Sequence, residues 1–269
     1  MTQTPAPRSR RSALYMPGAN ARALEKAKSL DADVLIFDLE DAVLPDAKDE
    51  ARSLVAEAVR GGGYSGEVVI RVNGEGTPWR REDLAMVRAV KPDAVLLPKV
   101  EAGAKPLDAI PLWAMIETPG AILNAGSIAA SGYQALVVGI NDLSKELRAP
   151  IAPGRGAFRM ALQTTVMAAR ASGIVALDGV FNSLDDEGGL AAECADGAAL
   201  GFDGKTLIHP SQIEEANAAF SPSAADVEQA RAIVEAFAAD PGAGVLRVRG
   251  QMTERLHLAA AEDLLARSR

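Results

Sequence analysis

The segment LWAMIETPGAILNAGSIAASGYQALVVGIND, residues 112–142, contains two short apolar runs, and each run leads to an acidic residue. The first run ends at Glu117 and the second at Asp142, with a helix-length segment between them. If both runs are neighbouring parallel strands, the two acids lie at the same end of a sheet, about 5 Å apart. Because two acids at that separation repel each other unless they share a cation, the pair predicts a divalent-metal site.

Similar runs, rich in Val, Leu and Ile, recur along the chain and alternate with helix-length segments. None shows a clean alternation of apolar and polar residues, which is typical of parallel strands covered on both faces. Eight such strands predict a TIM barrel rather than a doubly wound sheet, because no G-x-G-x-x-G turn follows the first strand. The expected strands are 12–18, 34–37, 68–74, 94–101, 112–117, 135–142, 174–180 and one within 198–210.

Three regions differ in composition. Residues 1–11 are polar and are expected to form a disordered tail, and residues 12–220 hold the expected barrel. Residues 221–269 are expected to form a C-terminal helical extension that acts as a lid, as an oligomerisation arm, or as both. Within the barrel, residues 154–173 are expected to form one long helix that ends at Gly173.

The bulk properties exclude several classes of protein. The formal net charge of −8 argues against a nucleic-acid-binding surface, and no apolar run approaches the length that spans a membrane. The single cysteine, Cys194, excludes an internal disulfide and a cysteine-built metal site. No signal peptide is recognisable, so we expect a cytoplasmic protein.

In a TIM barrel, the chemistry takes place where strands end and the following loops begin. Oxygen ligands without clustered histidines favour Mg²⁺, or Mn²⁺, over zinc, so Glu117 and Asp142 are the candidate metal ligands. The alternative for Asp142 alone is that it is an ordinary helix N-cap. The polar residues expected at strand ends are Asp38, Glu40, Asp41, Arg71, Asn73, Lys99, Glu101, Glu117, Asn141, Asp142 and Asp178.

Arg71 lies between β-branched residues in VVIRVN, where an unpaired arginine is costly. It either pairs structurally with the acidic cluster or binds an anionic substrate, and we favour binding of the substrate carboxylate. Asp38, Glu40 and Asp41 are then expected to orient this arginine and the metal-bound waters rather than to bind the metal directly.

Several blocks of the chain together resemble the HpcH/HpaI aldolase/citrate lyase family, in its branch similar to the citrate lyase β subunit. The blocks are RSALYMPGANARALEKA, DADVLIFDLEDAVLPDAKDEAR, VVIRVNG, AVLLPKVE, AMIETPGAI and GFDGKTLIHPSQI, and the similarity extends from Arg11 to about Ala238. The resemblance implies a Mg²⁺-dependent carbon–carbon lyase on a TIM barrel, usually a homotrimer or a multiple of one. It also implies a 3-hydroxyacyl thioester as substrate, such as a citryl, malyl or citramalyl group on CoA or on an acyl-carrier domain, and a 2-oxo acid as product.

The resemblance also implies roles for individual residues. The metal carboxylates fall on Glu117 and Asp142, and the substrate-binding arginine falls on Arg71. Glu117 would also contact the substrate, and Arg11 is a candidate for contacting the carrier of the thioester. In the implied reaction, a base removes the hydroxyl proton of the substrate, the carbon–carbon bond breaks, and Arg71 stabilises the departing enolate.

One departure from the family pattern affects the expected proton chemistry. Many relatives carry a segment resembling GRMVDRPH, whose aspartate is thought to act as acid/base in a neighbouring subunit's site, whereas this chain has GQMTERLH. The aspartate is replaced by Glu254, which we retain as the candidate acid/base, and the proline by Leu256. The replacement leaves two alternatives open: an aldolase or thioesterase acting on a related hydroxyacyl-CoA, and a catalytically weak subunit of a larger complex.

Overall fold

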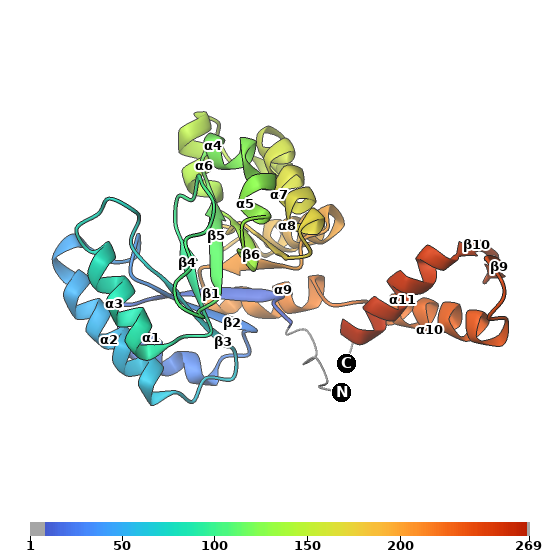
Figure 1. Cartoon of the computed structure of the whole chain (residues 1–269), viewed down its shortest axis with the longest axis horizontal. Coiled ribbons are helices and arrows are strands. Elements are labelled where there is room, and N and C mark those ends of the chain that lie inside the picture. Colours follow the sequence, from blue (N-terminus) through green and yellow to red (C-terminus); the bar gives the residue numbers. More distant parts are fainter. Residues whose placement is uncertain (1–8, 268–269) are drawn as a thin grey trace. The chain divides into compact units, whose positions relative to one another are not determined.

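In the computed structural model, which describes residues 9–267, eight parallel strands form a closed barrel in sequence order (Figure 1). The strands are β1 (Ser12–Pro17), β2 (Val34–Asp38), β3 (Glu67–Arg71), β4 (Ala94–Leu97), β5 (Leu112–Ile116), β6 (Ala135–Val138), β7 (Val175–Asp178) and β8 (Gly204–Leu207). The pairing of β1 with β8 closes the barrel. The predicted TIM barrel is confirmed.

Helices follow the strands and cover the outside of the barrel. They are α1 (Ala21–Lys26), α2 (Lys48–Gly61), α3 (Arg80–Val90), α4 (Pro119–Leu123), α5 (Ala125–Ala129), α6 (Ile140–Leu147), α7 (Arg159–Ala171), α8 (Glu187–Leu200) and α9 (Ile213–Ala219). In Figure 1, α1–α3 lie together on one side of the strands and α4–α8 on another. Among the helices of residues 9–267, none combines the length and the apolar character needed to cross a membrane.

Successive side chains of each strand point alternately into the barrel and toward the helices. Ile36, Val69 and Met115 belong to the apolar cluster that fills the barrel interior. Asp38, Arg71 and Glu117 follow these residues at a spacing of two. They therefore face the mouth of the barrel at the C-terminal ends of the strands, where TIM barrels carry their active sites.

The third and fourth strands end earlier than predicted, at Arg71 and Leu97, and two further elements also differ from the structure. The sixth strand ends at Val138, and Asp142 lies in the first turn of α6, which begins at Ile140. The long helix expected over 154–173 is divided, because Gly154 and Arg155 have left-handed backbone angles. A short 3₁₀ segment, η3 (Pro153–Phe158), therefore precedes α7. Gly173, with φ of 66°, lies just beyond α7, and its freedom to adopt that angle suits a helix end.

The chain divides into two compact units, and most of the second consists of the residues after Phe220. This unit contains α10 (Ala224–Ala239), the antiparallel strands β9 (Val245–Val248) and β10 (Gln251–Glu254), and α11 (Arg255–Arg267). Ser223 and Asp226 form a capping box at the start of α10. The extension is therefore not wholly helical, because a two-stranded hairpin separates its helices. Residues 1–8 of the expected tail lie outside the described residues.

Candidate functional site

Glu117, like Asp38, is an almost fully enclosed acid at the mouth of the barrel. Glu117 is 1% exposed, and its Oε1 accepts a hydrogen bond of 2.7 Å from the backbone N–H of Lys99. A Cβ atom at Gly139 would lie 2.3 Å from Oε2 of Glu117, so only glycine fits beside this carboxylate. The loops after β4 and β6 thus hold Glu117 in one place.

Burial raises the pKa of Glu117 to about 7, and the nearby charge of Asp142 shifts this pKa in the same direction. Asp142 is less enclosed, with a side-chain exposure of 25%. Its Oδ1 lies 3.6 Å from the Nζ atom of Lys99. Lys99, in the loop after β4, therefore contacts both acids, one through its backbone N–H and the other through its Nζ atom.

Arg71 is buried and its guanidinium is engaged mainly with Asp38. Nε and Nη2 donate to the two carboxylate oxygens of Asp38 at 2.7 and 2.6 Å, which is a bidentate pair. The register of β2 and β3 places the two residues side by side. Nη1 points to Glu40 and Asp41, at 3.1 and 3.4 Å. The structural pairing of Arg71 with the acidic cluster, which we did not favour, is thus present. The least constrained donor atom of Arg71 is Nη1.

Glu40 is the second acid whose environment disfavours its charge. Burial raises the pKa of Glu40 to about 8, Arg71 opposes this shift, and Asp41 and Glu117 add to it. Its Oε2 is buried and has no hydrogen-bond partner, although the ion pair with Nη1 of Arg71 is close. A buried carboxylate oxygen in this state is available for a further cation or donor.

The site has more acidic than basic groups. Its carboxylates belong to Asp38, Glu40, Asp41, Glu117 and Asp142, while the cationic side chains that contact them among the described residues are Arg71 and Lys99. This excess of carboxylates, together with the raised pKa values of Glu117 and Glu40, fits a divalent cation that prefers oxygen. Within residues 9–267, no group of three or more His, Cys, Asp or Glu side chains is arranged as a complete metal site. Two carboxylates with further positions taken by water and substrate are nevertheless what Mg²⁺ commonly uses.

Two of the predicted site residues are not part of this cluster. Arg11 precedes β1, so it lies at the N-terminal end of the barrel, opposite the mouth, and its guanidinium pairs with Asp33. The expectation that Arg11 contacts the substrate's carrier at the catalytic face conflicts with this position. Glu254 ends β10 in the second unit, where its backbone N–H donates to Nδ1 of His257.

A second charged cluster, which the sequence did not predict, lies between the barrel wall and the helices. Asp178 accepts hydrogen bonds from Arg155 at 2.6 and 2.8 Å and from Lys205 at 3.0 Å. Lys205 also donates to Glu193 on α8 at 2.7 Å. Asp178 follows the inward-facing Leu177, so its side chain points away from the barrel interior, and it is not a mouth residue as its place at a strand end suggested.

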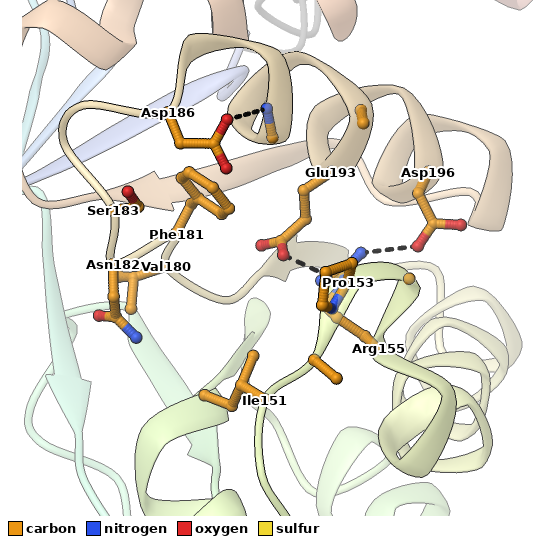
Figure 2. A pocket seen from close by; sticks show the side chains of 14 residues that line it. Ile151, Pro153, Arg155, Val180, Phe181, Asn182, Ser183, Asp186, Glu193 and Asp196 are labelled. Atoms are coloured by element: carbon orange, nitrogen blue, oxygen red, sulfur yellow. Dashed lines mark hydrogen bonds and ion pairs between the residues drawn. The ribbon is translucent and has the colours of Figure 1, made fainter.

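Figure 2 shows the pocket beside this second cluster, with Arg155 between Glu193 and Asp196. The pocket has a volume of about 400 Å³ and is lined by η3, by the residues after β7 and by α8. Asn182 in its wall exchanges two hydrogen bonds with Asn141, the neighbour of Asp142. The pocket therefore adjoins the mouth of the barrel through this pair of asparagines.

Comparisons with known proteins agree with this architecture. A family described as HpcH/HpaI aldolase/citrate lyase matches residues 11–210, and one described as a carbon–carbon bond lyase of the TIM-barrel fold matches residues 155–269. A (3S)-malyl-CoA thioesterase of Cereibacter sphaeroides is 47% identical over 96% of this chain and 94% of its own length. The citrate lyase β subunit of Escherichia coli is 34% identical over 97% of this chain and 94% of its own length.

Solved structures show the same fold. The protein CitE of Mycobacterium tuberculosis, in complex with magnesium, acetoacetate and coenzyme A, superposes with a TM-score of 0.82. It is 30% identical, and the match covers 97% of this chain and 98% of that one. A citrate lyase β subunit from the same organism, complexed with oxaloacetate and magnesium, gives a TM-score of 0.72 at 31% identity over 80% of this chain and 98% of its own.

Proposed function

Because this chain belongs to the HpcH/HpaI aldolase/citrate lyase family, we propose that it is a Mg²⁺-dependent enzyme that cleaves a carbon–carbon bond of a 3-hydroxyacyl-CoA thioester. The products would be an acetyl thioester and a 2-oxo acid. The observation that carries the proposal is the placement of Glu117 and Asp142 at the mouth of the barrel, with more carboxylates around them than cations. Magnesium in complexes of similar proteins supports the choice of ion, and Mn²⁺ would suit the same oxygen donors.

In this proposal, Glu117 and Asp142 hold the ion, which when bound supplies a Lewis acid toward the oxygen atoms of an anionic ligand. Asp38 fixes the plane of the Arg71 guanidinium through the bidentate pair, so Arg71 can present only Nη1 to a substrate. Arg71 would thus combine the structural pairing and the substrate binding that the sequence left as alternatives. Glu40 and Asp41 share Nη1 and would orient both this arginine and the water molecules of the site.

The second unit carries Glu254 at the end of β10. We propose that it serves as a lid or an oligomerisation arm, and that Glu254 supplies the acid/base function in an oligomer such as a trimer. Compared with aspartate, the longer side chain of Glu254 moves its carboxyl group by about 1 Å, a displacement large enough to alter proton transfer. A CoA-dependent reaction would also suit the cytoplasm, where we place the protein.

Hydrolysis of the thioester is the second candidate function. It is favoured by the 47% identity with the (3S)-malyl-CoA thioesterase, which exceeds the 34% identity with the citrate lyase β subunit. Both reactions place negative charge on the thioester oxygen, so Arg71 and a bound divalent cation would suit either reaction. They differ in the bond that breaks and therefore in their products.

One assay separates these possibilities. Malyl-, citramalyl- and citryl-CoA are incubated with the full-length protein and Mg²⁺, and free thiol and 2-oxo acid are measured separately. Oxo acid without thiol supports the lyase, and thiol without oxo acid supports the thioesterase. If neither product forms from any of the three, both enzymatic functions are rejected in favour of a binding subunit of a larger complex.

A further inference from the structure

Lys99 is held against the proposed metal site by its backbone. Its φ angle of 50° is in the left-handed region, which a residue with a side chain seldom adopts. This conformation accompanies the 2.7 Å hydrogen bond from its N–H to Oε1 of Glu117. Strained backbone of this kind is often maintained at functional sites, because surrounding contacts impose it. The main chain of Lys99 is therefore fixed beside one of the two proposed metal ligands.

The side chain of Lys99 reaches the other proposed ligand and remains accessible. Nζ lies 3.6 Å from Oδ1 of Asp142, an ion pair without a close hydrogen bond, and the side chain is 50% exposed. Arg71 differs, because it is buried and held by two hydrogen bonds to Asp38. Of these two cations, Lys99 is the one whose charge can move without breaking a bidentate pair.

A divalent cation on Asp142 would share that carboxylate with the ammonium group of Lys99. Two cations that share one carboxylate repel each other, and they do so more strongly where solvent is excluded. The ammonium would therefore weaken cation binding as long as it stays at Asp142. Because half of its side chain is exposed, it can turn away and still reach an anion bound beside the cation.

We propose that Lys99 competes with the divalent cation for Asp142 and, once the cation is bound, contacts the anionic ligand held beside it. This inference rests on the metal site of the proposed function and adds to it a positioning and specificity-determining residue. It makes the affinities for cation and anion depend on the same side chain in opposite directions. A residue needed only for folding would not give that pattern.

Two calorimetric titrations of the full-length protein test this inference. In the first, Mg²⁺ is titrated into wild type and Lys99→Met, and the variant should bind Mg²⁺ about tenfold more tightly. In the second, glyoxylate, a small 2-oxo acid, is titrated into protein saturated with Mg²⁺, and the variant should bind it about tenfold more weakly. Lys99→Arg keeps the charge and should stay within about threefold of wild type in both titrations.

Lys105→Met is the matched control, because Lys105 is on the same loop, is 84% exposed and pairs with Glu75 away from the site. It should leave both affinities unchanged. If Lys99→Met changes neither affinity, or weakens both, the role of Lys99 is rejected while the metal site stands. If wild type does not bind Mg²⁺, the metal site of the proposed function fails, and the role of Lys99 fails with it.

Discussion

The barrel carries two carboxylate-rich clusters, and they differ in how well their charges are matched. In the cluster at the mouth, defined by Glu117, Asp142, Glu40 and their neighbours, burial and like charges raise the pKa values of two acids. In the buried cluster of Asp178 and Glu193, each carboxylate accepts hydrogen bonds from Lys205, and Asp178 accepts two more from Arg155. In the first cluster the carboxylates outnumber the cations that contact them, whereas the second already contains its cations.

The two clusters differ because adjacent strand positions face opposite sides of the barrel wall. Glu117 continues the inward-facing series of Trp113 and Met115, so it reaches a mouth open to ligands. Asp178 follows the inward-facing Leu177, and therefore points into the layer of helices, where α8 supplies Glu193. Thus an acid at a strand end is a functional candidate only if it faces the barrel interior.

Replacing Glu117 by Gln should give the largest change in activity. The substitution removes one of the two carboxylates proposed to hold Mg²⁺, so we expect turnover of the active thioester to fall by about 10³-fold or more. The fold should be retained, because a neutral amide removes the buried charge whose loss of solvation, with the nearby charge of Asp142, raises the pKa of Glu117. Turnover and circular dichroism are measured together, with Glu101→Gln as the control at a neighbouring strand end. Wild-type turnover in Glu117→Gln would remove Glu117 from the site.

Replacing Lys205 by Met should give the largest change in stability. Lys205 is fully buried and pairs with Asp178 and Glu193, so its loss leaves charges unpaired inside the protein. We expect the free energy of unfolding, measured in urea, to fall by about 3–5 kcal/mol. Arg170→Met, which breaks an ion pair with Asp203 in which Arg170 is 46% exposed, should cost at most about 1 kcal/mol. Equal losses in the two variants would contradict the distinction between the clusters.

The pH dependence of stability tests the cluster at the mouth, and EDTA keeps divalent cations away from its carboxylates. The pKa of Glu117 is about 7 in the folded protein against an ordinary value of 4.5, so the folded state holds a proton that the unfolded chain releases. This contribution to stability is complete below pH 4.5 and is lost as the pH rises through 7. The part of this loss that Glu117 causes should be on the order of 3 kcal/mol, so the profile of Glu117→Gln should fall less than that of wild type by about this amount, while Glu40, whose pKa is raised to about 8, contributes a loss in both proteins. Unfolding in urea between pH 5 and 8 measures both, and identical profiles would contradict the raised pKa.

Much of the fold and part of the candidate site could be predicted because they depend on local patterns. The apolar runs and their spacing were sufficient for the barrel, and the acids that end two runs pointed to Glu117 and Asp142. The ends of elements were less predictable, because Asp142 belongs to the first turn of α6 rather than to a strand. Whether Glu117 and Asp142 bind metal stays a prediction.

Contacts between distant segments could not be predicted in the same way. Arg155 was assigned to a helix, because its left-handed backbone angle carries no signal in the residue itself. Its pairing with Asp178 depends on the closure of the barrel and on the break before α7. Lys99 was recognised at a strand end, but its contacts with Glu117, which follows β5, and with Asp142, in the first turn of α6, depend on how these later segments are placed in the fold.

The smallest expected effect concerns the asparagine pair that joins the two regions. Asn182 and Asn141 are both exposed and exchange two hydrogen bonds, at 2.7 and 3.2 Å, between the pocket wall and the start of α6. Asn182→Ala should cost less than about 1 kcal/mol of stability, because water replaces the lost partners of an exposed amide. Since Asn141 precedes Asp142, a small shift of α6 should still weaken Mg²⁺ binding by about two- to threefold. Calorimetry measures the change in Mg²⁺ binding, and urea unfolding measures the change in stability.

A loss of stability as large as that of Lys205→Met would mean that the mouth and the buried cluster form one cooperative network rather than two regions with separate roles.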